Sequence, residues 1–421
     1  MKKAETIKDV FHIFAYEKFL KKEDKDFYVE LYHNDFLRFV TALRNNELPS
    51  KSFFIAGQSG NGKSSVLNLL TTQYPDIGDK YEFNYIVGRK IFMYEDIDII
   101  DLLLMIGNVL TKDNEVLKQL YFDKLKNLED IKDGSKEESR STTNSSSDAM
   151  NVRAELSVGA KLFSMLKASI DFESSYKINE EIRKDARQFF KIKRKELIDL
   201  INEIIFEYKK NINKELIVVI DDLEKKDNVN ALFLKDMQLL NELNIVKIIT
   251  MPIHLHRNEN FPASDIREFG LKLHTLDGEK NLEDEKLLEE VIKKRLENKN
   301  LITNKAIKLA IKYSGANLRQ LIKLIHIGAE EALAFKSHNI DDKEIQNAIN
   351  RIQRDYSSKV MNMKKFLSDI DNGNGYDESE ENIINIEKAT KMELVFACFN
   401  GIVWYEINPI IKKPLEIYLR R

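Results

Sequence analysis

The stretch FFIAGQSGNGKSS, residues 53–65, limits the possible folds of this 421-residue chain more than any other segment. An apolar run ends at Gly57, a polar break closes with Gly62, Lys63 and Ser64, and a leucine-rich segment follows. A short apolar run that stops at a glycine is typical of a buried strand, and the segment after the break has the pattern of a helix. The sequence therefore predicts a strand, a glycine-rich turn and a helix in immediate succession.

The spacing of this break is G-x-x-x-x-G-K-[ST], which is typical of a phosphate-binding loop. Glycines let backbone N–H groups approach anionic oxygens, and the helix start adds its positive end. Lys63 is expected to reach the β- and γ-phosphates of ATP, and Ser64 to bind Mg²⁺. An ordinary strand–turn–helix junction is the alternative, and the flanking elements favour phosphate binding. The predicted nucleotide-binding residues are Gly57, Gln58, Ser59, Gly60, Asn61, Gly62, Lys63, Ser64 and Ser65.

A second signal is KELIVVIDDLEKKD, residues 214–227, in which an apolar run leads into two aspartates. This pattern is expected of a central parallel strand that ends at a ligand-binding edge. Asp221 is predicted to be a ligand of the Mg²⁺ site, because Mg²⁺ uses few protein oxygens and keeps its waters. A capping aspartate is the alternative. Either Asp222 or Glu224 would polarise the attacking water, and the sequence favours Asp222 only slightly.

The order of elements indicates an α/β fold with a parallel sheet, because apolar strand patterns alternate with helical ones up to about residue 280. Four helices are predicted after that point. The expected segments are an N-terminal helical segment at 1–45, a P-loop α/β core at 46–278 with an insertion at about 110–210, a helical lid at 279–356, an acidic linker at 357–384 and a small C-terminal unit at 385–421.

Three segments carry more specific expectations. Residues 180–210 read as one long amphipathic helix, and the polar stretch 137–148 reads as a loop or a disordered insertion. The C-terminal unit fits equally well a reduced winged helix, with its wing strands in NGIVWYEINPII at 400–411, or a helix–hairpin tail.

The motifs GQSGNGKSS, IVVIDDLE, IITMP and SGANLRQLIKLI occur in the order seen in AAA+ ATPases. Over about residues 50–340 the chain resembles most the branch that contains origin-recognition-type and STAND-type bacterial ATPases. This resemblance implies a helical lid over the nucleotide. It also implies that Thr250 takes the sensor-1 position and Arg319 the sensor-2 position, where a hydroxyl and a guanidinium contact the terminal phosphate. With Asp222 and Glu224, they form the predicted catalytic set.

The chain departs from this family pattern in two ways. The distance in sequence from Lys63 to Asp221 is longer than a compact core needs, which marks the insertion. No arginine finger stands out either, and Arg257 and Arg267 are the natural candidates for reaching the nucleotide of a neighbouring subunit.

The leading interpretation is an ATPase, in which Mg-dependent ATP binding and hydrolysis drive a conformational or assembly switch. Its partners would be a second copy of the chain or an effector protein, and the resemblance suggests a role in bacterial antiviral defence. The alternative is a nucleotide-gated DNA-binding initiator or loader with weak hydrolysis, supported by the C-terminal unit and the basic cluster at 183–195. A scaffold with a vestigial nucleotide site is the third reading. The sequence disfavours a GTPase, because no N-K-x-D segment follows the Asp221 strand.

Composition narrows the class of protein further. A balance of 66 basic against 69 acidic residues argues against a wholly basic nucleic-acid coat. The single cysteine, Cys398, allows no internal disulfide, which fits a reducing compartment. No secretory signal and no apolar stretch long enough for a bilayer are found, so a soluble cytoplasmic protein without membrane partners is expected. His254 and His256 lack the further ligands of a zinc site.

Overall fold

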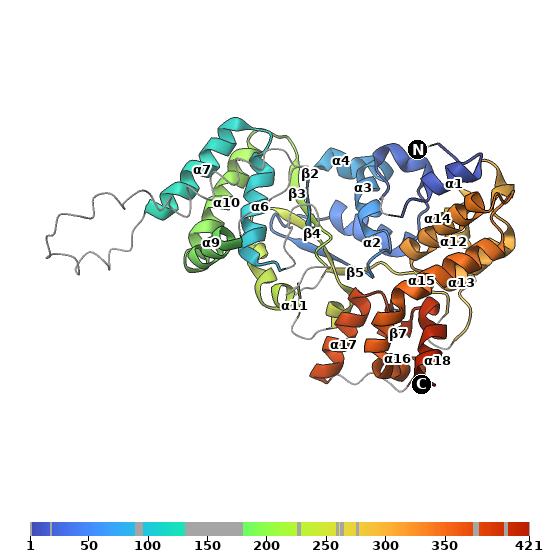
Figure 1. Ribbon diagram of the computed structural model, residues 1–421. Coiled ribbons are helices and arrows are strands. Elements are labelled where there is room, and N and C mark those ends of the chain that lie inside the picture. The colour runs from blue at the N-terminus through green and yellow to red at the C-terminus, as the bar shows by residue number, and fades with distance from the viewer. Residues whose placement is uncertain are drawn as a thin grey trace, which may run out of the picture. The chain divides into compact units, whose positions relative to one another are not determined.

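The computed structural model (Figure 1) divides into two compact units, which are described separately. The first unit comprises Met1–Asn46, Phe54–Gly78 and Thr250–Arg421, and the second comprises Glu47–Phe53 and Asp79–Ile249. The predicted loop at 137–148 lies outside the described residues. The structure describes residues 2–16, 19–88, 96–130, 180–224, 229–257, 261, 265–274, 278–373, 379–399 and 403–420.

A five-stranded sheet has the strand order β2-β3-β4-β1-β5. The registers of β2 with β3, β3 with β4 and β1 with β5 are all parallel, which confirms the predicted α/β fold with a parallel sheet. The side chains of β3 and β4 are almost all buried, as expected for strands covered on both faces. The strands are β1 (Ser52–Ala56), β2 (Tyr81–Val87), β3 (Glu215–Asp221), β4 (Val246–Met251) and β5 (Ile266–Glu268).

The first unit contains the four helices predicted after residue 280. Each of the last three begins at a side chain that accepts a hydrogen bond from the backbone of its first turn: Thr303, Asn317 and Asp341. Figure 1 shows α1 beside α14 in this unit. The helices are α1 (Ile7–Ile13), α2 (His33–Arg44), α3 (Lys63–Gln73), α12 (Leu282–Lys293), α13 (Asn304–Ser314), α14 (Leu318–Ala334) and α15 (Asp342–Asn362). A 3₁₀ helix forms at Lys22–Phe27, and α4 (Pro75–Lys80) begins within this unit and ends two residues beyond it.

The C-terminal part of the first unit is an antiparallel hairpin of β6 (Val395–Phe399) and β7 (Val403–Ile407). It lies in sequence between α17 (Glu380–Lys391) and α18 (Lys412–Leu419), and α16 (Lys364–Asp371) occupies part of the expected linker. Placing both wing strands within 400–411 was wrong, because only β7 lies there. Pro409 lacks a backbone N–H and starts a 3₁₀ turn capped by Asn408, so no second strand forms after β7.

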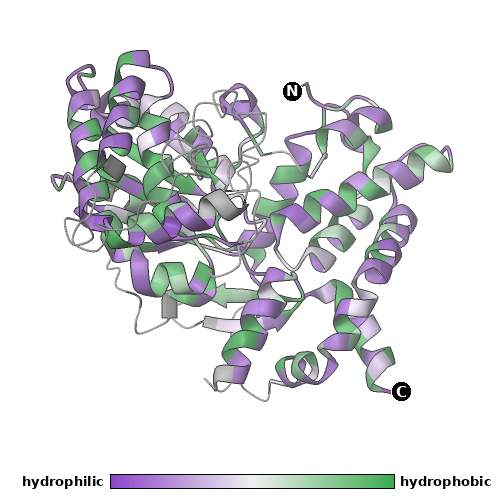
Figure 2. Ribbon diagram, turned by 60° about the vertical axis from the view of Figure 1, so that its left-hand side comes forward, coloured by the Kyte–Doolittle hydropathy of each residue, from purple (hydrophilic) through white to green (hydrophobic). Residues whose placement is uncertain are grey.

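The second unit is built around α6 (Ile99–Thr111), which is buried on all sides and packs against β2, α7, α9 and α10. Asp98 caps this helix through a capping box with Asp101. The green and purple segments in Figure 2 show how hydrophobic and hydrophilic residues alternate along the helices. The other helices are α7 (Glu115–Asp130), α9 (Glu180–Ile192), α10 (Arg194–Lys209) and α11 (Val229–Ala231), with short irregular helices at Leu232–Asp236 and Met237–Glu242.

The expectation of a single helix over 180–210 was wrong, because α9 ends and α10 begins around Lys193. The backbone of Lys193 leaves the helical region, with φ −102° and ψ 37°. Its ammonium donates a hydrogen bond to the carbonyl of Leu128, so the side chain is used to fix the break. An amphipathic pattern continues across such a break, which is why periodicity alone does not reveal it.

The basic cluster at 183–195 has acidic partners in the same unit. Arg187 forms ion pairs with Asp96 and Asp101, and Lys191 lies 3.0 Å from Asp98. These contacts attach α9 to the start of α6. They therefore favour the structural reading of this cluster over nucleic-acid binding.

Lys247 supplies a stability prediction for the second unit. Its ammonium is fully buried and donates to the carbonyls of Ser50 and Leu240 at 2.7 Å and of Leu243 at 3.3 Å. Lys247→Met removes these three hydrogen bonds, although the carbonyls of Leu240 and Leu243 each keep a backbone N–H donor, at 3.1 and 2.8 Å. At about 0.5–1.5 kcal/mol for each lost bond, we expect the free energy of unfolding to fall by about 1.5–4.5 kcal/mol, measured by denaturant unfolding. Lys195→Met, at an exposed site of the same unit, is the control; a similar loss in both variants would contradict this role.

None of the described helices is both long and apolar enough to span a membrane.

Candidate functional site

The glycine-rich turn has the predicted strand–turn–helix form: β1 ends at Ala56 and α3 begins at Lys63. Gly60 and Gly62 have φ of +91° and +82°, the left-handed region that L side chains rarely adopt. Gly57 is restricted by space instead, since a Cβ there would lie 2.6 Å from the carbonyl oxygen of Phe269. The glycines are therefore required by the shape of the loop.

Lys63 folds back over this loop. Its side chain is 4% exposed, and Nζ donates to the carbonyl oxygens of Gly57 at 2.9 Å and Gln58 at 3.2 Å. The first turn of α3 contains no acidic residue, so the positive end of the helix is not neutralised locally. The loop thus combines backbone N–H groups, a helix N-terminus and an ammonium, which is the chemistry that binds a phosphate chain.

The hydroxyls that follow Lys63 have different surroundings. Ser64 is half-buried, and its hydroxyl forms no hydrogen bond within the described residues. The Ser65 Oγ accepts from the backbone N–H of Leu20 at 3.1 Å and thereby fixes the N-terminal segment to α3. Of the two, Ser64 is the one with an oxygen available to a metal ion.

Thr250 lies next to the start of the loop, because the N–H of Gly57 donates to the carbonyl of the adjacent Met251 at 3.3 Å. Thr250 is fully buried at the carboxyl end of β4. This places it at the strand end where the resemblance expects a sensor hydroxyl.

The N-terminus of α14 is hydrogen-bonded directly to the loop. Asn317 donates to the carbonyl of Ser59 at 2.7 Å, and the backbone N–H of Arg319 donates to the carbonyl of Gly60 at 3.0 Å. The Arg319 guanidinium also donates to the Ser59 hydroxyl at 3.0 Å. The structure therefore brings together the loop and the predicted sensor arginine. Asn317 was not among the predicted residues, although an Asn directly before a helical pattern is an N-cap signal.

Arg319 has a second partner, Glu393, that no sequence motif predicts. Its Nη1 lies 3.4 Å from Oε1 of Glu393, and the hydroxyl of Tyr356 donates to Glu393 Oε2 at 3.3 Å. Burial and the charge of Glu393 raise the pKa of Tyr356, so this hydroxyl stays protonated and can donate. Glu393 has φ +59°, a strained backbone for a residue other than glycine.

Gln58 links the loop to the same C-terminal segment. Its Nε2 donates to the carbonyl of Thr390 at 3.2 Å, and its Oε1 accepts from the N–H of Ala397 at 3.4 Å. On α14, the side chains of Gln320 and Asn408 exchange two hydrogen bonds of 2.8 Å. The glycine-rich loop and α14 are therefore both bonded to the C-terminal hairpin region.

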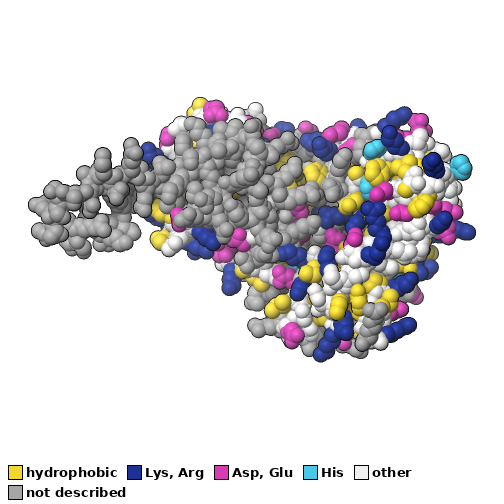
Figure 3. Space-filling view, viewed as in Figure 1, with side chains coloured by type: hydrophobic (Ala, Val, Ile, Leu, Met, Phe, Trp, Pro, Cys, Tyr) yellow, Lys and Arg dark blue, Asp and Glu magenta, His cyan; other side chains and the backbone are white. Residues whose placement is uncertain are grey.

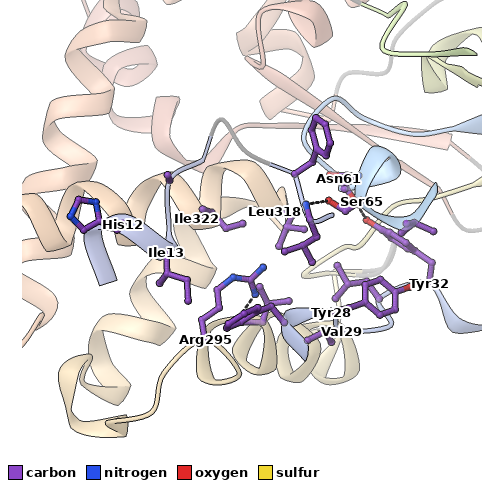
Figure 4. Close-up of a pocket in the computed structure, with 18 residues that line it drawn as sticks. His12, Ile13, Tyr28, Val29, Tyr32, Asn61, Ser65, Arg295, Leu318 and Ile322 are labelled. Atoms are coloured by element: carbon purple, nitrogen blue, oxygen red, sulfur yellow. Dashed lines mark hydrogen bonds between the residues drawn. The ribbon is translucent and has the colours of Figure 1, made fainter. Parts of the chain in front are cut away.

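A pocket adjoins the loop on the side of the N-terminal segment (Figure 4). The residues that line it come from the end of α1 and the segment after it, from the loop and α3, from α12 and the turn after it, and from α14; they include Ile13, Tyr28, Asn61, Ser65, Arg295 and Leu318. Most of the lining side chains are apolar or aromatic, as in sites for flat organic rings. Because Asn61 and Gly62 line it, the pocket adjoins the glycine-rich loop directly.

Tyr32 supports the wall of this pocket. Its hydroxyl donates to the carbonyl of Asn61, and its ring stacks on Phe269 with centroids 4.9 Å apart. Burial raises the pKa of Tyr32, which keeps the hydroxyl neutral. The N-terminal segment is thus part of the candidate site, which its helical sequence pattern alone does not predict.

The predicted acids lie in the second unit at the carboxyl end of β3. Asp221 is the last residue of the strand and is buried; its Oδ1 accepts from the N–H of Asp222 at 2.9 Å. Its charge adds to burial in raising the pKa of Tyr85 on β2. Asp222 is also buried and has φ +65°, whereas Glu224 is half-buried. Strained backbone of this kind is common at functional sites.

The remaining candidates have simpler surroundings. Arg267 donates to the carbonyl of Ile266 and to Asp265, so it is held locally; the side chain of Arg257 lies outside the described residues. Burial lowers the pKa of His254 to about 4, and the side chain of His256 is not described. Cys398 is buried in β6, and burial raises its pKa. Within the described residues no group of three or more His, Cys, Asp or Glu side chains can hold a metal ion by itself.

No protein-family model and no curated protein matches the chain. Among solved structures, the chain is similar to the Orc1 protein of Aeropyrum pernix in complex with DNA, with 11% identity and a TM-score of 0.41, covering 98% of this chain and 96% of that one. It is similar to Cdc6p from Pyrobaculum aerophilum with 12% identity and a TM-score of 0.41, covering 93% of each chain. It is also similar to the RuvB Holliday junction branch migration motor of Thermotoga maritima, with 10% identity and a TM-score of 0.35, covering 92% of this chain and 93% of that one.

Proposed function

We propose that this chain is an AAA+-type ATPase that binds ATP with Mg²⁺ and uses its hydrolysis as a conformational or assembly switch. The observation that carries the proposal is the geometry of the glycine loop. Lys63 lies over the loop, and the side chains of Asn317 and Arg319, at the N-terminus of α14, are hydrogen-bonded to the same loop. Release of phosphate from ATP by the purified chain tests it, and turnover no higher than that of a Lys63→Ala variant would contradict it.

ATP binding would replace contacts that the loop makes with itself. The two carbonyls that accept from Lys63 are neutral, whereas the β- and γ-phosphates carry charge, so the ammonium would gain stronger hydrogen bonds by moving to them. The base would occupy the largely apolar pocket that adjoins Asn61 and Gly62.

The roles of the hydroxyl and carboxylate groups rest on residue chemistry and strand position. Ser64 and Asp221 offer hard oxygen ligands of the kind that Mg²⁺ accepts. The metal would neutralise charge on the phosphates. Asp222, or Glu224 in its place, would hold the attacking water and accept its proton, while Thr250 would donate a hydrogen bond to the water or the terminal phosphate.

The switch would act through Arg319. In the structure its guanidinium is shared between Ser59 and Glu393, and a terminal phosphate is a stronger partner for it than a half-exposed carboxylate. When Arg319 turns to the phosphate, Glu393 loses its ion pair. The strained backbone at Glu393 and the bonds from Gln58 then connect the nucleotide state to the position of the C-terminal hairpin.

Glu393→Gln tests this exchange. Without its charge, residue 393 competes less for Arg319, so we expect ATP to bind about two- to fivefold more tightly, the range expected of a partly exposed ion pair. Equilibrium titration with a non-hydrolysable ATP analogue measures the effect. In an Arg319→Ala background the same change is expected to have no effect on affinity. An equal gain in both backgrounds would show that Glu393 does not act through Arg319.

The DNA-binding alternative receives less support. Arg187, Lys191 and Lys193 of the basic cluster are engaged within the second unit. On the described part of the face in Figure 3, basic and acidic side chains are intermixed. A salt-dependent complex with duplex DNA that is lost on removing residues 385–421 would restore this alternative. The defence role, the homo-oligomer or effector partner and the cytoplasmic location remain proposals from composition and resemblance.

A further inference from the structure

Arg295 is an unusual side chain in the pocket beside the phosphate loop. It lies just after α12 and is 5% exposed, yet it lines the pocket. Figure 4 shows its side chain extending into the space near Ile13, Tyr28 and Leu318. A cation in a largely apolar wall is costly unless something compensates it, so its presence calls for an explanation.

Within the described residues the compensation is incomplete. One nitrogen, Nη1, donates to the carbonyl of Val291 at 2.7 Å, and the guanidinium lies 5.9 Å from the ring centroid of Phe14. Neither Nε nor Nη2 has a hydrogen-bond acceptor there, and no carboxylate forms an ion pair with the group. Burial lowers the pKa of Arg295 to about 10, although the charge of Asp24 acts in the opposite direction. The group is nevertheless charged at neutral pH.

We propose that Arg295 reads the base of the bound nucleotide, by donating a hydrogen bond to an acceptor nitrogen of the adenine ring. The inference rests on the proposed function, because it takes ATP as the occupant of the site. A guanidinium can only donate, and the purine ring nitrogens N1, N3 and N7 can only accept. The aromatic and aliphatic walls then cover the faces of the ring, and Arg295 fixes its orientation.

The same geometry argues against a phosphate as the partner of Arg295. The phosphate chain has its own donors in the loop amides and Lys63. The wall around Arg295 consists of side chains such as Ile13 and Leu318, which suit a neutral ring better than a highly charged group. A small number of placed polar groups in a largely apolar pocket is the usual means of fixing the orientation of a ligand.

The test compares ligands that differ in one part of ATP. Affinities of the full chain are measured for ATP, inorganic tripolyphosphate, the 1-, 3- and 7-deaza analogues of ATP, and 2′-deoxy-ATP. Arg295→Met is expected to weaken ATP about ten- to a hundredfold while leaving tripolyphosphate within twofold. One of the three deaza analogues is expected to bind the unaltered chain as weakly as ATP binds Arg295→Met. The Arg295→Met variant is expected to bind that analogue and ATP with equal affinity. Arg351→Met, at a half-exposed arginine of α15, is the matched control.

The ligand-free proteins provide a second readout. Because Arg295 is a buried cation without an ion pair, Arg295→Met should melt no lower than the unaltered chain, whereas a structural arginine would lower the melting temperature on removal. The inference is overturned if tripolyphosphate weakens as much as ATP, if 2′-deoxy-ATP but no deaza analogue loses affinity, or if only the melting temperature changes. If the unaltered chain binds neither ATP nor tripolyphosphate, the proposed function itself has failed.

Discussion

Lys63→Ala is expected to weaken ATP binding roughly a hundredfold or more. The ammonium would donate charge-assisted hydrogen bonds to two phosphates, each with an expected contribution of about 1.5–3 kcal/mol. The loop has no second cation from α3 to replace it, since the first turn of that helix continues with two serines and a valine. Titration calorimetry with ATP and Mg²⁺ measures the loss.

Two controls make this result specific. Lys308→Ala removes an exposed lysine of α13 and should leave ATP affinity unchanged. Because Lys63 also holds the carbonyls of Gly57 and Gln58, the melting temperature of the ligand-free variant must be compared with that of the unaltered chain. Micromolar affinity retained by a folded Lys63→Ala protein would rule out the loop as the phosphate site.

Asp222→Asn is expected to lower the rate of ATP hydrolysis about 100- to 10 000-fold while ATP still binds, the range expected on losing a general base. Asparagine has nearly the shape of aspartate and tolerates the left-handed backbone seen at this position, so the fold should be retained. Single-turnover hydrolysis and nucleotide retention after rapid gel filtration measure the two effects separately.

Glu224→Gln is the matched variant for this second prediction. Glu224 lies two residues further on and is less buried, so its neutralisation should reduce turnover much less than that of Asp222. If the order is reversed, Glu224 is the group that accepts the proton of water. If neither variant slows hydrolysis, the catalytic carboxylate lies elsewhere.

The sequence predicts the local parts of this molecule well. The strand–glycine–helix succession around Lys63, the buried strand that ends at Asp221 and the four helices after residue 280 each follow from residues that are close in sequence. A glycine requirement, a continuous apolar run and an N-cap are all short-range signals. The start of α6 at Asp98 is of the same kind.

What the sequence did not reveal depends on distant residues meeting in space. Gln58 and Thr390 are hydrogen-bonded although 332 positions separate them, and nothing in either segment indicates the pairing. Glu393 as a partner of Arg319 and Arg295 as part of the pocket were missed for the same reason. The break at Lys193 escaped because the amphipathic pattern continues through it.

A crystal structure of the chain with Mg²⁺ and a non-hydrolysable ATP analogue would show whether the glycine-rich loop binds the nucleotide. We expect the phosphates within hydrogen-bond distance of the amides of residues 59–64 and of Lys63 Nζ, with the base in the pocket beside Arg295. Lys63 still bonded to Gly57 and Gln58, with the nucleotide bound elsewhere or absent at saturating concentration, would contradict it.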